Sequence, residues 1–247
     1  MPGTSFDRVA DIYDETRGGE RRGSHFADSL SPWIRGPRVV ELGIGTGVIA
    51  HGLQRHGIDV VGVDLSDAMM RAAVGRIGPR VATADVDRLP FADSSIDTAY
   101  FVWVLHLVHD PTATLTEAAR VVRPAGNIAT ITNGHAYDAD DEIAPIVDAL
   151  APLRQARLDH NTVVTADHPG LEFVHEGFTD WLEVETTPSV EADAIENRIY
   201  SSLFDVDDEA WQRVVIPVID ALRSLPEPDR PRRRRNRHPL LVWETRR

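Results

Sequence analysis

The stretch "RVVELGIGTGVIAHGLQRHGIDVVGVDLS", from Arg38 to Ser66, decides the fold. Two short valine-rich runs flank a segment with apolar residues at helical spacing, an order typical of a strand, a crossover helix and a parallel strand. Gly43, Gly45 and Gly47 stand where the first strand would turn into the helix. Glycine lets a ligand lie against the backbone there, and the free N–H groups of a helix start attract acceptor atoms. The stretch therefore predicts an α/β fold with a ligand at its glycine loop.

The same alternation of apolar runs and helical patterns continues along the chain. It predicts an α/β protein with a seven-stranded, mostly parallel, doubly wound sheet. The expected strands are residues 38–42, 59–64, 80–84, 98–102, 127–132, 181–186 and 239–245. The expected helices are residues 47–56, 67–77 with Ser66 as its cap, 111–122, 140–157, 191–203 and 207–225.

The composition excludes several kinds of chemistry. Without cysteine the chain has no disulfide, thiolate nucleophile or Cys-based metal site, and we expect no metal. A formal charge of −13 argues against a nucleic-acid partner, because such binding depends on basic residues that neutralise phosphates. We find no leader and no apolar run approaching the ~18 residues of a membrane span, which predicts a cytoplasmic protein without a membrane partner.

One basic segment stands out in this acidic chain. The run "RPRRRRNRH", residues 230–238, contains six arginines. We interpret it as a solvated loop before the last strand, and a grip on an acidic substrate or partner is the alternative.

An aspartate follows the glycine loop at the distance expected of a nucleoside site. Asp64 closes the second strand, where a carboxylate can accept hydrogen bonds from two ribose hydroxyls. The spacing G-x-G-x-G differs from the G-x-G-x-x-G of NAD or FAD sites and disfavours those cofactors. The alternative is a tight turn with a surface carboxylate beside it. The combination favours a nucleoside-containing cofactor.

The motifs, taken in order, resemble those of class I S-adenosylmethionine-dependent methyltransferases. "ELGIGTG" resembles the first motif, "GVDLSDAMMRAA" the second, and "ATADVDRLPFADSSIDTAYFVWVLHLV" the third and fourth. "LPFADSSID" and the N-terminal "FDRVADIYDETRG" are similar to the group that includes ubiquinone- and menaquinone-biosynthesis methyltransferases and other small-molecule methyltransferases. The likeness covers residues 6–132 and implies a Rossmann-like methyltransferase fold with a helical lid.

The resemblance also implies a cofactor, S-adenosylmethionine, and its product, S-adenosylhomocysteine. Tyr13 and Arg17 would fold over the methionine end, and Glu41 would orient the loop or receive the amino group. Met69 would pack on the adenine, although an apolar helix residue can equally be core. The remaining cofactor residues would be Gly43, Gly45 and Gly47 along the methionine and ribose, Asp64 at the ribose, and Asp85 with the Val86 amide at the adenine edge.

Methyl transfer from a sulfonium depends chiefly on alignment, and a general base is needed only for some acceptors. The candidate base is His106, just beyond the fourth strand, and a packed structural histidine is the alternative. Trp103 would line the acceptor cavity or brace it. Tyr137 and His135 would contact the acceptor, or be ordinary loop residues.

We therefore predict a single methyltransferase domain with N-terminal lid helices at 1–35, a cofactor core at 36–132, substrate-side lid segments at 133–180 and 187–237, and a last strand at 238–247. The predicted reaction methylates an oxygen, nitrogen or carbon of a small molecule in secondary metabolism. The alternatives are an RNA methyltransferase and a protein that binds S-adenosylmethionine without methylating. A nicotinamide oxidoreductase is disfavoured by the glycine spacing, and a homodimer is left open.

Overall fold

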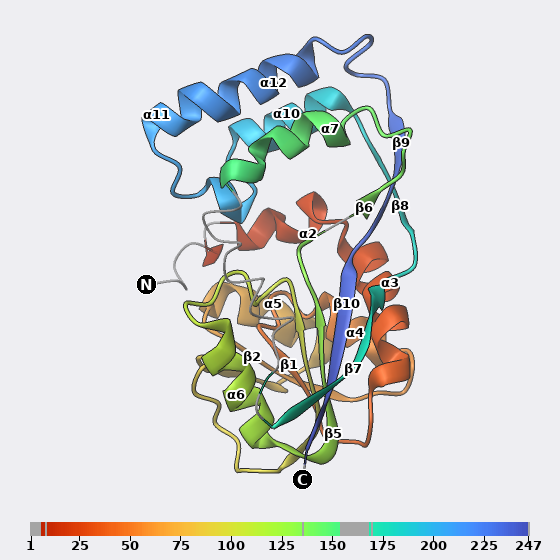
Figure 1. The fold of residues 1–247 in the computed structure, drawn as a ribbon, viewed down its shortest axis with the longest axis vertical. Coiled ribbons are helices and arrows are strands. Elements are labelled where there is room, and N and C mark those ends of the chain that lie inside the picture. The colour runs from red at the N-terminus through yellow and green to blue at the C-terminus, as the bar shows by residue number, and fades with distance from the viewer. Residues whose placement is uncertain (1–5, 8, 135, 154–167, 169, 247) are drawn as a thin grey trace. The chain divides into compact units, whose positions relative to one another are not determined.

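The computed structural model describes residues 6–7, 9–134, 136–153, 168 and 170–246 of the chain (Figure 1). Its internal contacts divide the chain into two compact units. Unit 1 comprises Met1–His135, His160–Asp180 and His238–Arg247, and unit 2 comprises Ala136–Asp159 and Trp181–Arg237.

Unit 1 is built on a seven-stranded sheet of the order β3-β2-β1-β4-β5-β10-β7. Strands β1 to β5 pair in parallel, whereas β10 runs antiparallel to both β5 and β7. The strand order reverses between β1 and β4, and ligands bind outside the carboxyl ends of strands at such a switch point. The predicted fold class is confirmed. The strands are β1 Val39–Leu42, β2 Val60–Asp64, β3 Val81–Thr83, β4 Ile96–Val102, β5 Val122–Ile131, β7 Leu171–Phe178 and β10 Pro239–Thr245.

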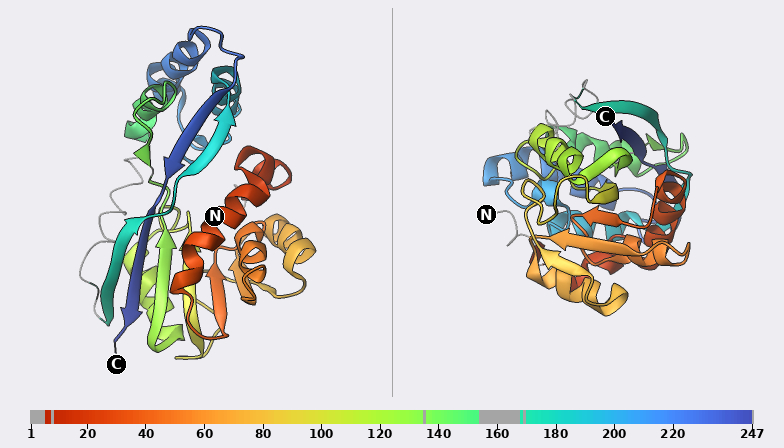
Figure 2. Two further views of the ribbon diagram at one scale, coloured as in Figure 1. Left: turned by 90° about the vertical axis from the view of Figure 1, so that its right-hand side faces the viewer. Right: turned by 90° about the horizontal axis from the view of Figure 1, so that it is seen from below.

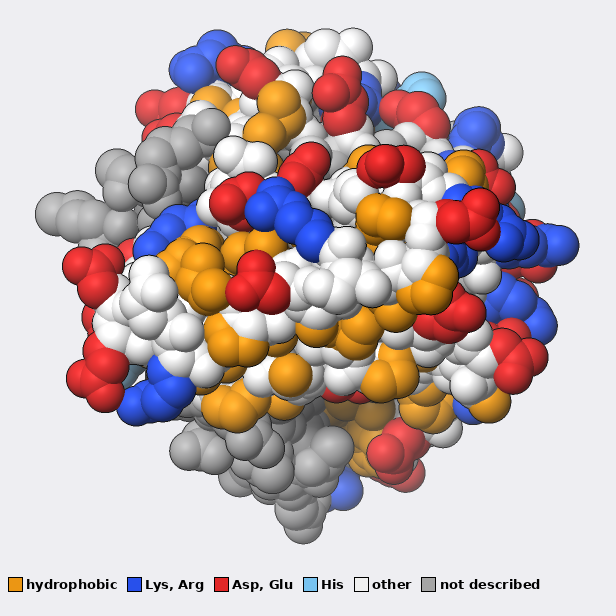
Figure 3. Space-filling view, turned by 90° about the horizontal axis from the view of Figure 1, so that it is seen from above, with side chains coloured by type: hydrophobic (Ala, Val, Ile, Leu, Met, Phe, Trp, Pro, Cys, Tyr) orange, Lys and Arg blue, Asp and Glu red, His pale blue; other side chains and the backbone are white. Residues whose placement is uncertain are grey.

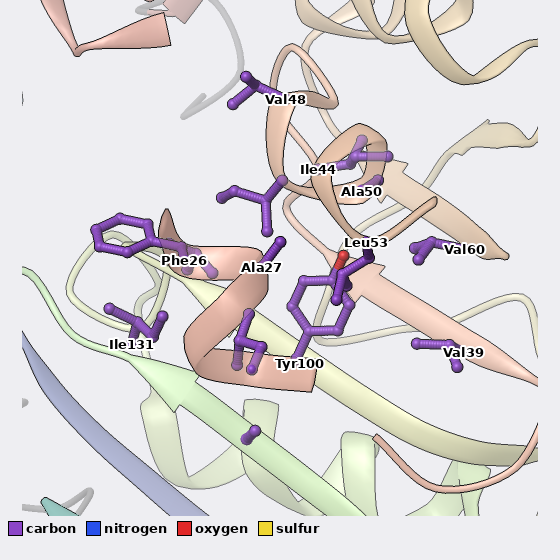
Figure 4. Close-up of a cluster of buried hydrophobic side chains, with 14 of the residues drawn as sticks. Phe26, Ala27, Val39, Ile44, Val48, Ala50, Leu53, Val60, Tyr100 and Ile131 are labelled. Atoms are coloured by element: carbon purple, nitrogen blue, oxygen red, sulfur yellow. The ribbon is translucent and has the colours of Figure 1, made fainter. Parts of the chain in front are cut away.

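Helices cover both faces of this sheet (Figure 2). The helical elements of unit 1 are η1 Ala10–Ile12, α2 Tyr13–Thr16, α3 Gly19–Leu30, η2 Ser31–Trp33, α4 Val48–Gln54, α5 Asp67–Ile77 and α6 Pro111–Val121. One buried cluster joins α3, α4 and α5 to the sheet through Phe26, Leu53 and Ala73. Figure 4 shows part of this cluster, including Phe26 and Leu53. A second cluster joins α6 to the opposite face through Leu115 and Val121.

Side-chain caps explain where two of these helices begin. The Ser66 hydroxyl accepts the N–H of Met69 at the start of α5, as the sequence predicts. Asp110 accepts the N–H groups of Thr112 and Ala113 at the start of α6. Such capping replaces hydrogen bonds that the first helical turn cannot make internally.

The position of α3 is set by close backbone contact with α4. A Cβ atom added to Gly23 would lie 2.5 Å from the Val48 carbonyl oxygen, and one added to Gly52 would lie 2.7 Å from the Gly23 oxygen. Because any side chain at either position would separate the helices, glycine holds α3 directly against α4.

The membership of the main sheet differs from the prediction in two places. Residues 171–178, expected in a lid segment, form strand β7 at its edge. Residues 181–186, expected in the main sheet, supply β8 Leu182–Thr186 of a separate three-stranded sheet. Exposed side chains along β7 hide its strand pattern, since only Leu171 of that strand is buried.

Unit 2 combines the small antiparallel sheet β6-β9-β8 with short helices. Its strands are β6 Ala136–Tyr137, β8 and β9 Arg232–Arg237. Its helical elements are α7 Ala144–Val147, η3 Asp148–Leu150, α10 Pro188–Glu196, η4 Ser201–Leu203, α11 Asp208–Ala210, η5 Trp211–Val215 and α12 Ile216–Arg223. Ile143, Ile195 and Leu222 belong to a hydrophobic core that is the unit's own.

The arginine run is not a solvated loop, because Arg232–Arg237 forms strand β9. Its guanidinium groups meet carboxylates from other elements of unit 2. The pairs are Arg232–Glu142 at 3.2 Å, Arg233–Glu183 at 2.5 Å, Arg234–Asp141 at 2.7 Å and Arg235–Asp138 at 3.4 Å. Basic and acidic side chains are likewise interspersed on the face that Figure 3 shows.

In the described part of the chain, no helix is long and apolar enough to cross a membrane. The same residues contain no group of three or more His, Cys, Asp or Glu side chains placed to hold a metal ion.

Candidate functional site

The glycine loop turns sharply away from β1. The N–H groups of Gly43 and Ile44 both donate to the Val63 carbonyl at 2.9 Å, which joins the loop to the end of β2. Gly43, Gly45 and Gly47 have φ values of 79°, 54° and 75°, in the left-handed region that favours glycine. A Cβ on Gly43 would lie 2.5 Å from the Val104 side chain, whereas one on Gly45 would meet nothing within 4 Å. Gly43 is thus needed for packing, and Gly45 borders open space.

Asp64 lies beside this open space. Its Oδ2 accepts the Gly45 N–H at 2.8 Å, and its Oδ1 accepts the Ser66 N–H at 2.8 Å. Burial raises the pKa of Asp64, while the N–H groups of Ser66 and Gly45 act in the opposite direction. The backbone therefore orients the carboxylate, and each oxygen still has a lone pair for a ligand hydroxyl.

Glu41 lies inside the protein below the loop. Its side chain is buried, and the Tyr100 hydroxyl donates to its Oε2 at 2.9 Å. Burial raises the pKa of Glu41 to about 8, although the Tyr100 hydrogen bond lowers it. Glu41 is therefore mostly protonated at neutral pH, and a cation bound beside it would favour the carboxylate.

Arg22 is the site residue that the sequence analysis missed. Its side chain belongs to α3 and is 3% exposed. Among the described residues, its Nε and Nη1 have no hydrogen-bond partner. Its guanidinium carbon lies 4.8 Å from the Trp103 ring centroid and 5.4 Å from that of Tyr13. Burial lowers the pKa of Arg22. A signal was available, because Arg22 shares a helical stripe with Phe26 and Leu30, both fully buried.

Trp103 follows the carboxyl end of β4 in an unusual backbone conformation. Its φ is 57°, and its indole Nε1 is buried without a hydrogen-bond partner among the described residues. The indole contacts Phe26 at 5.4 Å and His238 at 5.2 Å between ring centroids. A left-handed residue other than glycine at a strand end is a feature that clusters at functional sites.

The N-terminal residues named from the sequence lie together. The Arg17 guanidinium carbon is 5.9 Å from the Tyr13 ring centroid, and Phe6 meets Tyr13 edge-on at 6.3 Å. Since Arg22 also lies over Tyr13, two arginines lie near one tyrosine ring.

The remaining predicted residues are more scattered. Met69 is buried, and Val86 is 8% exposed. Asp85 is exposed, and its Oδ1 accepts the Asp87 N–H at 3.0 Å. His106 is half-buried in the loop after β4. The adenine contacts of the first three and the catalytic role of His106 stay predictions.

Tyr137 differs from the others because it lies in unit 2. Its ring centroid is 5.0 Å from the Arg234 guanidinium carbon, so its described neighbour is an arginine of β9. His135, named with it, lies outside the described residues.

The glycine loop and its carboxylates fall within a known domain. Residues 40–130 match the family model described as "Methyltransferase domain". This part of the chain is therefore similar to the methyltransferase family, and the chain resembles the class I S-adenosylmethionine-dependent methyltransferases. The matched range contains most of the predicted cofactor residues, and Tyr13, Arg17 and Arg22 lie before it.

Curated relatives and solved structures agree with this family. The demethylmenaquinone methyltransferase of Tropheryma whipplei (strain Twist) is 28% identical over 191 residues, covering 73% of this chain and 77% of the relative. The demethylmenaquinone methyltransferase of Corynebacterium kroppenstedtii is 32% identical over 153 residues, covering 61% of this chain and 64% of the relative. An S-adenosylmethionine-dependent methyltransferase of Thermotoga maritima has a TM-score of 0.56 at 16% identity and covers 100% of both chains. At that identity the structural likeness shows the fold alone.

Proposed function

We propose that this protein transfers the methyl group of S-adenosylmethionine to an oxygen, nitrogen or carbon of a small-molecule acceptor and releases S-adenosylhomocysteine. One observation supports this proposal most directly: Asp64 is bonded to Gly45, and Gly45 borders open space. A backbone-oriented carboxylate beside an accessible glycine turn suits a ribose.

The charges of Glu41 and Arg22 complement those of the cofactor. S-adenosylmethionine has an ammonium, a carboxylate and a sulfonium group. In our proposal Glu41 receives the ammonium, and the buried guanidinium of Arg22 receives the carboxylate. Arg22 is suited to that role because an arginine can bind a carboxylate through two parallel hydrogen bonds.

The other cofactor contacts follow the sequence prediction. We propose that Tyr13 and Arg17 cover the methionine end, that Met69 packs on the adenine, and that Asp85 and the Val86 amide bind its edge. The positions of Tyr13 and Arg17 beside Arg22 support the first of these contacts.

When bound, the cofactor would supply an electrophilic methyl group on a positively charged sulfur, a leaving group that can take back the carbon–sulfur electron pair. The chain's own contribution is to align the two partners and exclude water. For a hydroxyl or an acidic carbon, we propose His106 as the base that takes the proton, with Trp103 and Tyr137 lining the acceptor site.

The curated relatives named above are demethylmenaquinone methyltransferases, so a quinone-like ring is the first acceptor class to test. Apart from residues 171–178, which form β7 of the main sheet, the division into lid segments 1–35, 133–180 and 187–237 around core 36–132 and strand 238–247 also stays a proposal. So do a cytoplasmic location and a homodimer. Arginines of β9 are paired with carboxylates of the same unit, so they do not support the alternative of an RNA substrate.

Thermal unfolding with S-adenosylmethionine, S-adenosylhomocysteine and NAD tests the cofactor. A ligand at 100 times its Kd should stabilise the protein by ~2.7 kcal/mol, and hence raise the Tm by roughly 5–10 °C. The two adenosyl ligands should give this shift in the wild type, NAD should not, and Asp64→Ala should lose it. Asp59→Ala, which changes an exposed aspartate just before β2, is the matched control.

Formation of S-adenosylhomocysteine with quinols, phenols and amines then tests the reaction. Activity with at least one acceptor class is expected. Tight cofactor binding without turnover on any of them would instead favour the non-methylating alternative.

A further inference from the structure

The N-terminal strap, which we define as residues 6–7 and 9–17, is tied to the glycine loop through Asp14. Asp14 Oδ1 accepts the hydroxyl of Thr46 at 2.7 Å, and its Oδ2 accepts Nη2 of Arg76 at 2.5 Å. Thr46 stands between Gly45 and Gly47 in the loop proposed to hold the cofactor. One strap carboxylate therefore binds both the loop and the helix behind it.

Arg76 completes this connection from α5. Its Nη1 donates to the Thr46 carbonyl at 2.8 Å, and its Nε donates to Glu20 of α3 at 3.1 Å. The side chains of Arg76 and Asp14 are only 25% and 22% exposed, so solvent screens this pair less than it screens an exposed ion pair. The same guanidinium thus holds the backbone of the glycine loop and the strap.

A second attachment lies at the turn between β2 and α5. Asp7 Oδ1 accepts the Ser66 hydroxyl at 2.5 Å and the Ala68 N–H at 3.3 Å. These bonds, the one from Ser66 first, lower the pKa of Asp7. Ser66 also donates its N–H to Asp64, so the strap touches both turns that bear the proposed ribose contacts.

Two glycines join the strap to the rest of unit 1. Gly18 and Gly19, with φ values of 82° and 43°, separate α2 from α3. Because α3 is held against α4 by the Gly23–Gly52 contact, a large backbone change at this junction would move the strap and leave α3 in place.

We propose that Asp14, Thr46 and Arg76 form a clasp that couples closure of the N-terminal strap to the ordering of the cofactor loop. The proposal rests on the cofactor site proposed above. Opening the strap breaks the Asp14 bonds, and Thr46 then loses its side-chain partner. Cofactor bound at Gly45 therefore leaves only after the clasp opens, and Asp14 and Arg76 act as positioning residues.

The dissociation rate of S-adenosylhomocysteine tests the clasp. Asp14→Asn should increase this rate about tenfold to a hundredfold, since hydrogen bonds to charged groups are lost. The KM for S-adenosylmethionine should rise, while kcat at saturating cofactor should change much less. The matched control is Asp59→Asn, which removes an Arg80 pair of 2.6 Å between exposed side chains at the amino end of β2, and its rate should equal that of the wild type.

Hydrogen exchange of the amides in residues 9–17 gives a second readout. Saturating S-adenosylhomocysteine should slow this exchange in the wild type and slow it far less in Asp14→Asn. If Asp14→Asn is unfolded at the assay temperature, Thr46→Val serves instead, because it removes the same hydroxyl bond and nearly preserves side-chain volume.

The outcomes separate the two proposals. If the wild type binds neither adenosyl ligand, the proposed function is wrong. If the wild type binds S-adenosylhomocysteine, but the folded variant has the same dissociation rate and the same strap protection, the clasp is wrong.

Discussion

Two buried arginines, one in each unit, have opposite surroundings. Arg234 of unit 2 is bonded to Asp141 at 2.7 Å and lies 3.8 Å from Glu191. Burial lowers its pKa, but Asp141 and the neighbouring charges raise it above the usual value. Arg22 of unit 1 has two nitrogens without a hydrogen-bond partner among the described residues, and burial lowers its pKa.

We interpret Arg234 as a structural cation and propose Arg22 as a ligand-binding one. Asp141, which Arg234 contacts, also accepts the N–H groups of Ile143 and Ala144 at the start of α7, so the pair joins β9 to that helix. Arg22 lies among aromatic rings near Glu41, in the pocket proposed for a ligand with a carboxylate. A buried guanidinium with nitrogens that lack hydrogen-bond partners is costly, and a bound anion would remove much of that cost.

The largest expected effect concerns Arg234. Arg234→Ala should lower the free energy of unfolding by about 3–5 kcal/mol, because it leaves Asp141 and Glu191 buried without their cation. Urea unfolding followed by circular dichroism measures this change. Arg233→Ala, at a side chain that is 71% exposed, is the control and should cost no more than ~1 kcal/mol. Equal costs for the two variants would contradict a structural role specific to Arg234.

The next effect concerns the pH dependence set by Glu41. Its folded pKa of about 8 is above the unfolded value, so the stability it contributes is present at low pH and lost as pH rises through 8. Between pH 6 and pH 9 the cofactor-free wild type should lose about 3 kcal/mol that Glu41→Gln does not lose. Unfolding of both proteins across this range measures the difference, and parallel pH profiles would show that Glu41 titrates normally.

Glu41 also links pH to cofactor binding. Because the cationic cofactor favours the carboxylate form, its affinity for the wild type should increase as pH rises toward 8 and then level off. Calorimetric titration in buffers of different ionisation enthalpy should detect the released proton. An affinity that does not vary with pH would argue against an ammonium beside Glu41.

The smallest expected effect concerns Arg22. Arg22→Met should leave the stability of the cofactor-free protein unchanged or slightly higher, since it removes a buried charge two of whose nitrogens have no hydrogen-bond partner among the described residues. The affinity for S-adenosylhomocysteine should fall by about 1.5–3 kcal/mol, the value of a hydrogen bond to a charged group. Arg21→Met, at the exposed neighbouring position, is the control. A large loss of stability with unchanged affinity would make Arg22 a structural residue like Arg234.

The predicted glycine loop and the observed one agree because their features are local. A left-handed turn between a buried strand and a helix requires glycine at particular positions, and the side chain at the end of the next parallel strand must lie at the same sheet edge. Ser66 could be recognised as a cap for a similar reason, since its partner is three residues away. Motifs of this kind can be recognised from the sequence alone.

The missed features all depend on partners far away in the chain. The partner of Arg234, Asp141, lies 93 positions earlier, and Arg22 meets Trp103 across the switch point of the sheet. Strand β7 has exposed side chains on most of its length, so its place is decided by pairing with β10 and not by its own pattern.

The sequence by itself determined the α/β fold, the position of the glycine loop and the carboxylates near the carboxyl ends of its first two strands. These follow from spacing along the chain, because strand and helix periods and left-handed turns are local properties of the backbone. Only the tertiary structure decided that the arginine run is a paired strand, that Arg22 is buried without a hydrogen-bond partner for two of its nitrogens, and that Asp14 reaches Thr46 and Arg76. Hydrogen bonds and charges act over a few ångströms in space, and one sequence does not specify which distant residues come that close.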